Sequence, residues 1–335
     1  MIDYLNFGII GTGLMARTYA NIINQRYDCR LKVVAGNTIE NTLRFAKMFD
    51  IASYSGSAYD IMFEQHPEIH AVVVATPEWI RIEPIKAAIK FNKHILLEKP
   101  FSSSIDSAYE LKHLLQNYKK VFQICHVLRY NAKFNALNKS IRNGDIGIIR
   151  HIYARRNSNN ERVQRVLGKT NLAFWLTPHD VDIMRWITNS EISEVYAVSN
   201  NKLNSKDDYL TANLKFKSGV DAILQISWCN PPLSGTSREA VFEVWGNKGY
   251  IEVEDFNMNI KVFSDNKNVS TYDTFENFEI NGIYRGMFEN LLDNFIRKIN
   301  QNDFSNDCLD DAFQSINICD MISRSIKQQC IIEAK

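Results

Sequence analysis

The stretch FGIIGTGLMA, residues 7–16, decides the first part of the fold. A short apolar run ends there in the spacing GxGxxA, made by Gly11, Gly13 and Ala16, and a helix-like segment follows. At a turn from a strand into a helix, the first glycine permits the tight bend and the second leaves room for a diphosphate. The alanine lets the helix pack closely on the strand. In this context the motif predicts a dinucleotide-binding turn. The residues expected to contact the dinucleotide are Gly11, Thr12, Gly13, Leu14 and Met15.

The chain up to residue 126 alternates short apolar runs with helix-like segments. The runs span residues 6–10, 31–35, 71–76, 94–99 and 121–126. Several of them are continuously apolar, as expected of strands that are buried on both faces of a parallel sheet. This alternation predicts a doubly wound α/β fold, that is, a Rossmann domain over residues 1–126.

Beyond residue 147 the pattern changes to longer runs in which apolar and polar residues alternate. Residues 246–249, with the sequence GNKG, predict a hairpin turn between two of these runs. Amphipathic helices follow near residues 284–299 and 308–327. These patterns predict a second, α+β domain over residues 127–335, with an open and largely antiparallel sheet that is covered on one face.

Composition excludes several classes of protein. A chain of 335 residues suits two domains of about 150 residues each. With 39 Lys and Arg against 38 Asp and Glu, the sequence offers no surface for nucleic acid or a membrane. It shows neither a secretion signal nor a membrane-spanning run, and its six cysteines form no CxxC pair, so we expect a cytoplasmic protein with reduced thiols. No metal is expected, because Pro67 argues against a helix that would join His66 and His70 as ligands.

The end of the second predicted strand has the sequence Gly36-Asn37-Thr38. A carboxylate at this place would bind the hydroxyls of the adenosine ribose, whereas an arginine would accommodate the 2′-phosphate of NADP. The turn contains neither, so both NAD and NADP are candidate cofactors, and NADP is expected to be tolerated. Asn37 and Thr38 are the expected contacts.

Thr76 and Pro77 end the apolar run 71–76. Open α/β sheets bind ligands beyond the carboxyl ends of their strands, so these two residues and the nearby Trp79 are candidate cofactor contacts. The same residues are also compatible with an ordinary turn into a helix.

The stretch HILLEKPF, residues 94–101, ends a predicted strand in two charges, Glu98 and Lys99, and Pro100 stops the strand. A buried strand does not end in this way unless the charges face a cleft or each other. Lys99 beside a nicotinamide could hydrogen-bond with a reacting oxygen. The alternative is a surface ion pair, which contributes little.

The stretch AFWLTPHDVDIMRW, residues 173–186, predicts the start of a helix. Thr177 suits the N-cap, Pro178 the first helical position, and Asp180 a capping box, so Asp180 is expected to be structural and Asp182 to bond a backbone group or Arg185. In that case His179 would lie in the first turn, where the helix dipole keeps its ring neutral and able to accept a proton. A structural histidine is the alternative.

Two segments supply further candidates. Residues 125–131, CHVLRYN, contain His126, Arg129 and Tyr130, which could contact cofactor or substrate. Residues 153–170 have weak periodicity and hold four arginines that could bind a carboxylate, phosphate or sugar hydroxyl from a mobile lid. A solvated loop is the alternative. The arginines are Arg155, Arg156, Arg162 and Arg165.

Taken together, GxGxxA, the Thr-Pro turn, NKHILLEKP and HDVD resemble the Gfo/Idh/MocA oxidoreductases, and the similarity runs nearly end to end. The resemblance implies hydride transfer between NAD or NADP and a secondary hydroxyl or ketone of a sugar, cyclitol or sugar derivative. It further implies that Lys99 lies beside nicotinamide and substrate, that Pro100 is a cis-proline, and that His179 is the acid/base. The family pattern is D-x-x-x-H, but this chain has Trp175 in place of the aspartate, and we expect Trp175 to shape the substrate pocket or pack in the core.

The resemblance also implies a homodimer or homotetramer built through the open sheet. An inactive nucleotide-binding member, or an imine or amino-group reductase, would fit the same fold. The expected catalytic residues are Lys99 and His179. The expected cofactor contacts beyond the first two turns are Thr76, Pro77, Trp79, Glu98, Lys99 and Arg129. The expected substrate contacts are Lys99, His126, Arg156, Trp175 and His179.

Overall fold

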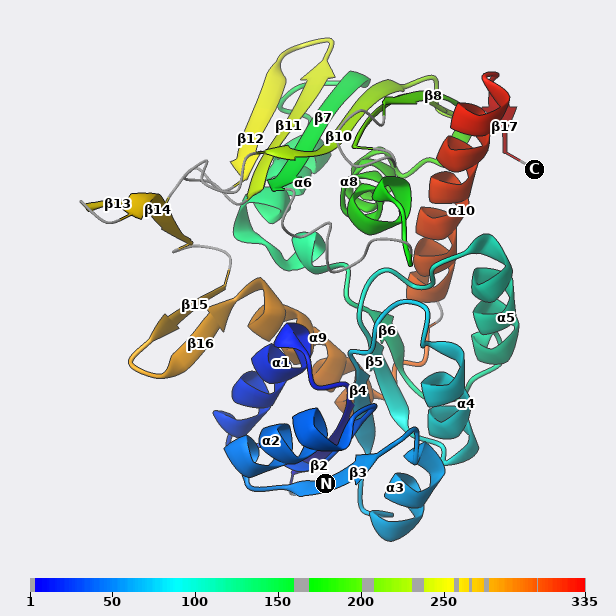
Figure 1. Ribbon diagram of the computed structural model, residues 1–335. Helices are drawn as coiled ribbons and strands as arrows, with labels where there is room; N and C mark the ends of the chain where they lie inside the picture. Colours follow the sequence, from blue (N-terminus) through cyan, green and yellow to red (C-terminus); the bar gives the residue numbers. More distant parts are fainter. Residues whose placement is uncertain are drawn as a thin grey trace. The chain divides into compact units, whose positions relative to one another are not determined.

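The computed structural model describes residues 4–159, 169–200, 208–230, 238–255, 259–264, 267–273, 277–305 and 307–334. The chain forms two compact units (Figure 1). The first contains Met1–Val127 and Glu279–Phe313, and the second contains Leu128–Phe278 and Gln314–Lys335. Among the described residues, no helix is long and apolar enough to cross a membrane.

The first unit is built on a six-stranded parallel sheet with the strand order β3-β2-β1-β4-β5-β6. Strands β1, β4 and β5 at its centre are buried along their whole length, which explains their continuously apolar sequences. The order reverses between β1 and β4, the place where such sheets bind ligands beyond their carboxyl ends. The strands are β1 (Leu5–Ile10), β2 (Cys29–Gly36), β3 (Ala52–Ser55), β4 (Ala71–Val74), β5 (His94–Leu97) and β6 (Phe122–Ile124).

Helices connect these strands, and the doubly wound Rossmann fold predicted from the sequence is confirmed. Strand β3 was not predicted, because its sequence ASYS is short and polar and lies at the sheet edge. The helices are α1 (Leu14–Asn24), α2 (Ile39–Phe49), α3 (Tyr59–Gln65), α4 (Ile82–Lys90) and α5 (Ile105–Leu115).

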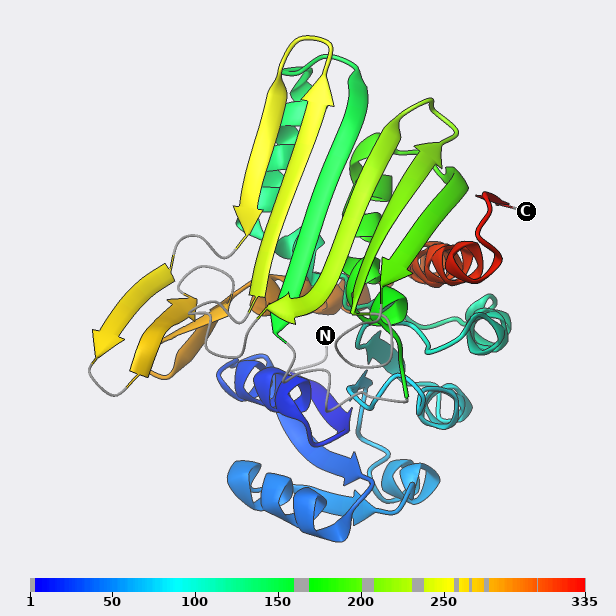
Figure 2. The ribbon, with the colours of Figure 1, turned by 45° about the horizontal axis from the view of Figure 1, so that its top comes forward.

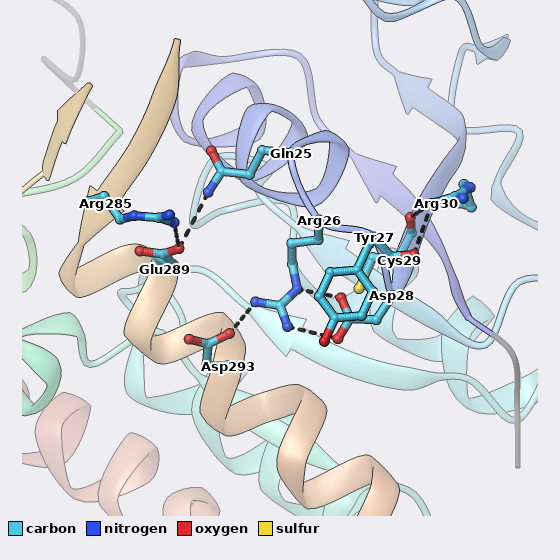
Figure 3. A network of polar contacts seen from close by, with 9 residues as sticks. All are labelled: Gln25, Arg26, Tyr27, Asp28, Cys29, Arg30, Arg285, Glu289 and Asp293. Carbon is cyan, nitrogen blue, oxygen red and sulfur yellow. Dashed lines mark hydrogen bonds and ion pairs between the residues drawn. The ribbon is translucent and has the colours of Figure 1, made fainter. Parts of the chain in front are cut away.

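A late segment of the chain returns to the first unit, so the units differ from the contiguous division 1–126 and 127–335. Helix α9 (Met287–Gln301) buries an apolar face, and the ring of Phe295 lies 6.4 Å from that of Phe7 in β1. Figure 3 shows the polar contacts beside it: Arg26 bridges Asp28 and Asp293. Helix α9 covers apolar surface of the first unit that would otherwise be exposed to water, and this burial stabilises the unit.

Two strands precede α9, and Gln25 of the first unit bonds the second of them. They are β15 (Asn277–Ile280) and β16 (Ile283–Gly286), which pair with each other. The Gln25 amide donates to the carbonyl of Tyr284 at 2.8 Å and accepts from its backbone N–H at 2.8 Å.

The second unit contains a seven-stranded sheet with the order β12-β11-β7-β10-β9-β8-β17. Its pairs are antiparallel except for the parallel pair β10–β7, so the prediction of an open, largely antiparallel sheet is confirmed. The predicted hairpin at residues 246–249 is also confirmed, since Gly246 N donates to Gly249 O at 2.8 Å. The strands are β7 (Ile149–Asn159), β8 (Ile192–Asn200), β9 (Tyr209–Phe216), β10 (Asp221–Asn230), β11 (Arg238–Gly246), β12 (Tyr250–Asp255) and β17 (Ile332–Glu333).

Within the described part of the chain, helices cover one face of this sheet and none covers the other (Figure 2). The 3₁₀ helix η1 (Val127–Tyr130) leads into α6 (Ala132–Asn143), and α8 (Leu172–Thr188) packs on β7, β9 and β10. Helix α10 (Asp307–Gln328) reaches β8, where Ser325 accepts a hydrogen bond from Ala197 N at 2.9 Å. A separate hairpin pairs β13 (Asn259–Ser264) with β14 (Lys267–Asp273).

Candidate active site

The glycine turn lies where β1 ends, and neighbouring strand ends hold it in place. Gly11 has a φ of +123°, and a Cβ there would lie 2.4 Å from the carbonyl oxygen of Ala75. Gly11 N donates to Ala35 O at the end of β2, and Ala75 N donates to Ile10 O, each at 2.8 Å. Gly11 is therefore required both by its backbone conformation and by the close approach of the chain that follows β4.

Gly13 serves a different purpose, because its surroundings are open. It is the N-cap of α1, where no side chain caps the helix, and a Cβ on it would meet nothing within 4 Å. The first backbone N–H groups of α1 therefore lie beside open space, as a diphosphate requires. Leu14 is 73% exposed, and Thr12 and Met15 are partly exposed, so their role as cofactor contacts stays a prediction. The turn fits a dinucleotide.

The end of β2 explains why no carboxylate follows this strand. A Cβ on Gly36 would lie 2.2 Å from Thr42 Oγ1 and 2.9 Å from Thr12 Cγ2. Thr42 is itself held, since its hydroxyl donates to Thr38 O at 2.6 Å. No side chain fits at residue 36 unless Thr42 moves, whereas Asn37 and Thr38 are exposed.

The ends of β4 and β5 are joined by Arg81, a residue that sequence reasoning missed. Its guanidinium is 3% exposed and donates to Val74 O at 3.1 Å and to Lys99 O at 3.4 Å. Burial lowers the pKa of Arg81 to about 10, although Glu98 and Glu78 oppose this. Thr76 lies in the turn between β4 and α4, and its hydroxyl donates to Ile80 O. A buried arginine in a loop has no periodic signal, so the sequence alone did not reveal it.

Glu98 and Lys99 differ in exposure. Glu98 is 5% exposed, and one of its carboxylate oxygens has no hydrogen-bond partner among the described residues. Burial raises the pKa of Glu98, against the opposing charges of Lys99 and Arg81. Lys99 is half-buried, and the Lys99–Pro100 peptide is cis, as the resemblance implied. Glu98 is thus enclosed in the first unit, and Lys99 is the more exposed of the two charges.

Helix α8 begins earlier than predicted, and this changes the surroundings of His179. The helix starts at Leu172, where the side chain of Asn171 accepts from Phe174 N at 3.0 Å, so Thr177 is not the N-cap and Pro178 lies inside the helix. The prediction that Thr177 and Asp180 cap the helix was wrong, because an earlier cap residue was available. His179 is half-buried about two turns into the helix, and not in its first turn as predicted.

Asp180 and Asp182, on either side of His179, are both bound by arginines. Arg156 of β7 donates to the Asp180 carboxylate at 2.7 and 2.9 Å, and both side chains are buried. Arg129 of η1 donates to Asp182 at 2.9 and 2.7 Å. These bidentate pairs tie α8 to β7 and to η1.

These pairs correct several predictions. The Arg156 fork holds Asp180 and lies in a strand, so residues 153–159 are not a solvated loop or lid. Arg155 pairs with Glu239, and Arg185 pairs with Glu191 at 2.8 Å. Arg162 and Arg165 lie outside the described residues.

The remaining predicted site residues are Trp175, His126, Tyr130 and Trp79. Trp175 is half-buried, and its ring lies 5.2 Å from that of Trp228 in β10 at 64°, which supports packing rather than proton transfer. His126 is 7% exposed just beyond β6, and Tyr130 is half-buried at the end of η1. Trp79 is half-buried in the turn after β4. Among the described residues, no cluster of His, Cys, Asp or Glu could hold a metal ion.

Two family models match the chain. One, described as an oxidoreductase family with an NAD-binding Rossmann fold, matches residues 5–126, and the other, the GFO/IDH/MocA C-terminal domain, matches residues 134–252. The chain belongs to the GFO/IDH/MocA oxidoreductase family. The first match contains the glycine turn and Lys99, and the second contains Arg156 and His179. The family supports NAD or NADP as the cofactor, as the sequence predicted.

Named relatives cover most of the chain. The uncharacterized oxidoreductase YrbE of Bacillus subtilis is 26% identical over 255 residues, which are 72% of this chain and 71% of that protein. The 1,5-anhydro-D-fructose reductase of Ensifer adhaerens is 24% identical over 252 residues, 72% of this chain and 74% of the reductase. The structure of scyllo-inositol dehydrogenase from Lactobacillus casei with bound NAD(H) and scyllo-inositol is 18% identical, with a TM-score of 0.82 over 98% of this chain and 99% of that one.

Proposed function

We propose that the protein is an NAD(P)-dependent dehydrogenase that acts on a secondary hydroxyl, or the corresponding ketone, of a sugar, cyclitol or sugar derivative. The observation that carries this proposal is the open space beside Gly13 at the start of α1, where a diphosphate fits. Lys99, the proposed catalytic lysine, follows β5 in the same unit. The names of the relatives, a reductase of 1,5-anhydro-D-fructose and a scyllo-inositol dehydrogenase, support the substrate class.

The cofactor would be held by the first turn of α1. When bound, the nicotinamide supplies the chemistry of accepting or donating a hydride. The backbone N–H groups after Gly13 bind the diphosphate, and Leu14 and Met15 border it. Thr76, Pro77 and Trp79 are the proposed contacts after β4, as Asn37 and Thr38 are after β2.

Lys99 and His179 are the proposed catalytic residues. The Lys99 ammonium would donate to the reacting oxygen and stabilise the negative charge that develops on it. His179 would exchange the proton of the hydroxyl. Arg156 and Arg129 then serve as positioning residues, because they fix the aspartates on either side of His179. His126 and Trp175 are proposed to line the substrate.

The proposal is tested by incubating the purified protein with NAD, NADP and a panel of inositols, sugars and anhydro sugars. Formation of reduced nicotinamide with at least one of them is the expected result. Lys99→Ala should abolish this activity, whereas Lys119→Ala, a matched change of a lysine away from the glycine turn, should have no effect. Reduced nicotinamide without dependence on Lys99 would contradict the catalytic assignment.

A second candidate function is a nucleotide-binding protein without catalytic activity. It is favoured by Trp175, which takes the place of the aspartate that usually accompanies the histidine and packs on Trp228. Tight cofactor binding with no turnover on the entire panel in either direction would support this candidate. Turnover of an imine would instead indicate an amino-group reductase.

The protein is also proposed to form a homodimer or homotetramer through the uncovered face of the second unit's sheet. Large apolar side chains are exposed along its outer strands, among them Tyr196, Val198, Trp245 and Tyr250. Light scattering should therefore give a mass of two or four chains, and a monomer would contradict the proposal.

A cytoplasmic location is also proposed. It is supported by the six cysteines, all of which are free thiols.

A further inference from the structure

A pocket of about 210 Å³ is lined by the glycine turn, the N-terminal half of α1 and one side of α2. The two helices run side by side on the first unit (Figure 1). Arg17 from α1 and Arg44 from α2 supply two cationic side chains to the lining, and Phe45 and Met48 supply apolar ones. The residues that line the pocket are Thr12, Arg17, Asn41, Arg44, Phe45 and Met48.

Neither arginine of this pocket is neutralised by a carboxylate within the part of the chain that the structure describes. Arg44 donates to the amide oxygen of Asn41 at 2.5 Å, and it forms no ion pair with Glu40, which lies one turn earlier on the same helix. Other arginines of this unit have acidic partners, such as Arg26 with Asp28 and Asp293 (Figure 3). The pocket therefore presents two guanidinium groups that lack an acidic counter-charge.

The position of the pocket relates it to the cofactor. Thr12 belongs to the glycine turn, and its methyl group faces Gly36 at the end of β2. In dinucleotide-binding folds, a carboxylate at the end of this strand binds the 2′-hydroxyl of the adenosine ribose, and a nearby arginine accommodates a 2′-phosphate. Here Gly36 leaves no room for a carboxylate, and the arginines come from the helices on either side.

We infer that Arg17 and Arg44 bind the 2′-phosphate of NADP and that the protein prefers NADP to NAD. Guanidinium groups match phosphate oxygens in a bidentate geometry. The two positive charges of Arg17 and Arg44 also exceed the one negative charge of Glu40 in the first turn of α2. Asn41 positions Arg44 through the hydrogen bond between their side chains. This inference rests on the proposed binding of a nicotinamide dinucleotide and adds its phosphate selectivity.

The experiment measures binding rather than turnover. Calorimetry of the full-length protein with adenosine 2′,5′-bisphosphate, adenosine 5′-diphosphate and inorganic phosphate isolates the adenosine end of the cofactor. The bisphosphate should bind at least about 10-fold more tightly than the diphosphate. Inorganic phosphate should bind much more weakly than either, because it lacks the adenosine contacts.

Variants assign this preference to the two arginines. Arg17→Met and Arg44→Met should each remove most of the preference for the bisphosphate and leave affinity for the diphosphate unchanged. Lys47→Met is the matched control, since Lys47 is exposed on the same helix as Arg44 but does not line the pocket. Asn37→Asp should reverse the preference by placing a negative charge beside the ribose.

Equal binding of the two nucleotides by the wild type, or a preference that survives in both arginine variants, would overturn the inference and leave the proposed dehydrogenase intact. Inorganic phosphate that binds as tightly as the bisphosphate would also overturn it, since the pocket would then be a general anion site. Failure of both nucleotides to bind would overturn the cofactor assignment together with this inference.

Discussion

At the scale of single residues, Gly11 and Gly13 show that two glycines of one motif serve different ends. Gly11 is fixed by its φ of +123° and by the carbonyl of Ala75, whereas Gly13 borders open space. The sequence predicted the turn from strand to helix at these positions, and the structure has it; the binding of a diphosphate beside Gly13 stays a prediction. It could not predict that Gly36 excludes a side chain, since Thr42 contacts it only after α2 folds back.

Gly13→Val separates binding from folding. We expect the valine to fill the diphosphate position, so that NADPH no longer raises the melting temperature, while the unliganded protein melts close to the wild type. Gly11→Ala should instead lower the free energy of unfolding by about 1–3 kcal/mol, because alanine disfavours this backbone conformation. Thermal unfolding with and without NADPH distinguishes the two. Normal stabilisation of Gly13→Val by the cofactor would contradict the diphosphate assignment.

Glu98 predicts a specific dependence of stability on pH. Burial raises the folded pKa of this carboxyl above its ordinary value of 4.5, so the folded protein binds the proton more tightly than the unfolded chain. The contribution of Glu98 to the free energy of unfolding is then fully present below pH 4.5 and is lost as pH rises through the folded pKa. Glu98→Gln should remove this loss. Denaturant unfolding of both proteins across this pH range checks it, and an equal difference between them at every pH would contradict it.

At the scale of elements, α8 shows where local sequence signals fail. The sequence predicted Thr177 as the N-cap, because Pro178 follows it and proline is most common in the first turn of a helix. Local rules therefore favoured Thr177. The structure instead keeps Pro178 inside the helix, where a preceding turn packs Leu172, Ala173 and Phe174 into the core. That burial outweighs the hydrogen bond that proline removes.

The pairing of Arg156 with Asp180 likewise depends on packing between β7 and α8 and has no signature in the sequence. Arg156→Met leaves a buried carboxylate without its partner and should lower the free energy of unfolding by about 3–5 kcal/mol. Arg155→Met, which breaks the more exposed pair with Glu239, should cost only about 0–1 kcal/mol. Chemical denaturation measures both. Equal stability of the two variants would mean that the Arg156–Asp180 pair does not hold α8.

At the scale of the whole molecule, the sequence predicted both sheets but not the path of the chain between the units. Helix α9 was expected from its periodicity, yet amphipathic periodicity does not tell which unit covers the apolar face. In the structure, the apolar face of α9 is covered by the first unit, since the rings of Phe288 and Phe295 pack on Tyr19 and Phe7. The same limit applies to Arg17 and Arg44, which belong to one pocket only because α1 and α2 are neighbours.

We propose that the protein is a dehydrogenase in which His179 exchanges the proton of the reacting hydroxyl. The most direct test is the turnover number of His179→Asn on a substrate found with the panel of inositols and sugars, compared with the wild type at saturating cofactor. We expect the turnover number to fall about 10²–10⁴-fold, with folding and cofactor affinity preserved, because the variant lacks only the acid/base. Full turnover by His179→Asn would contradict it and assign this histidine a structural role.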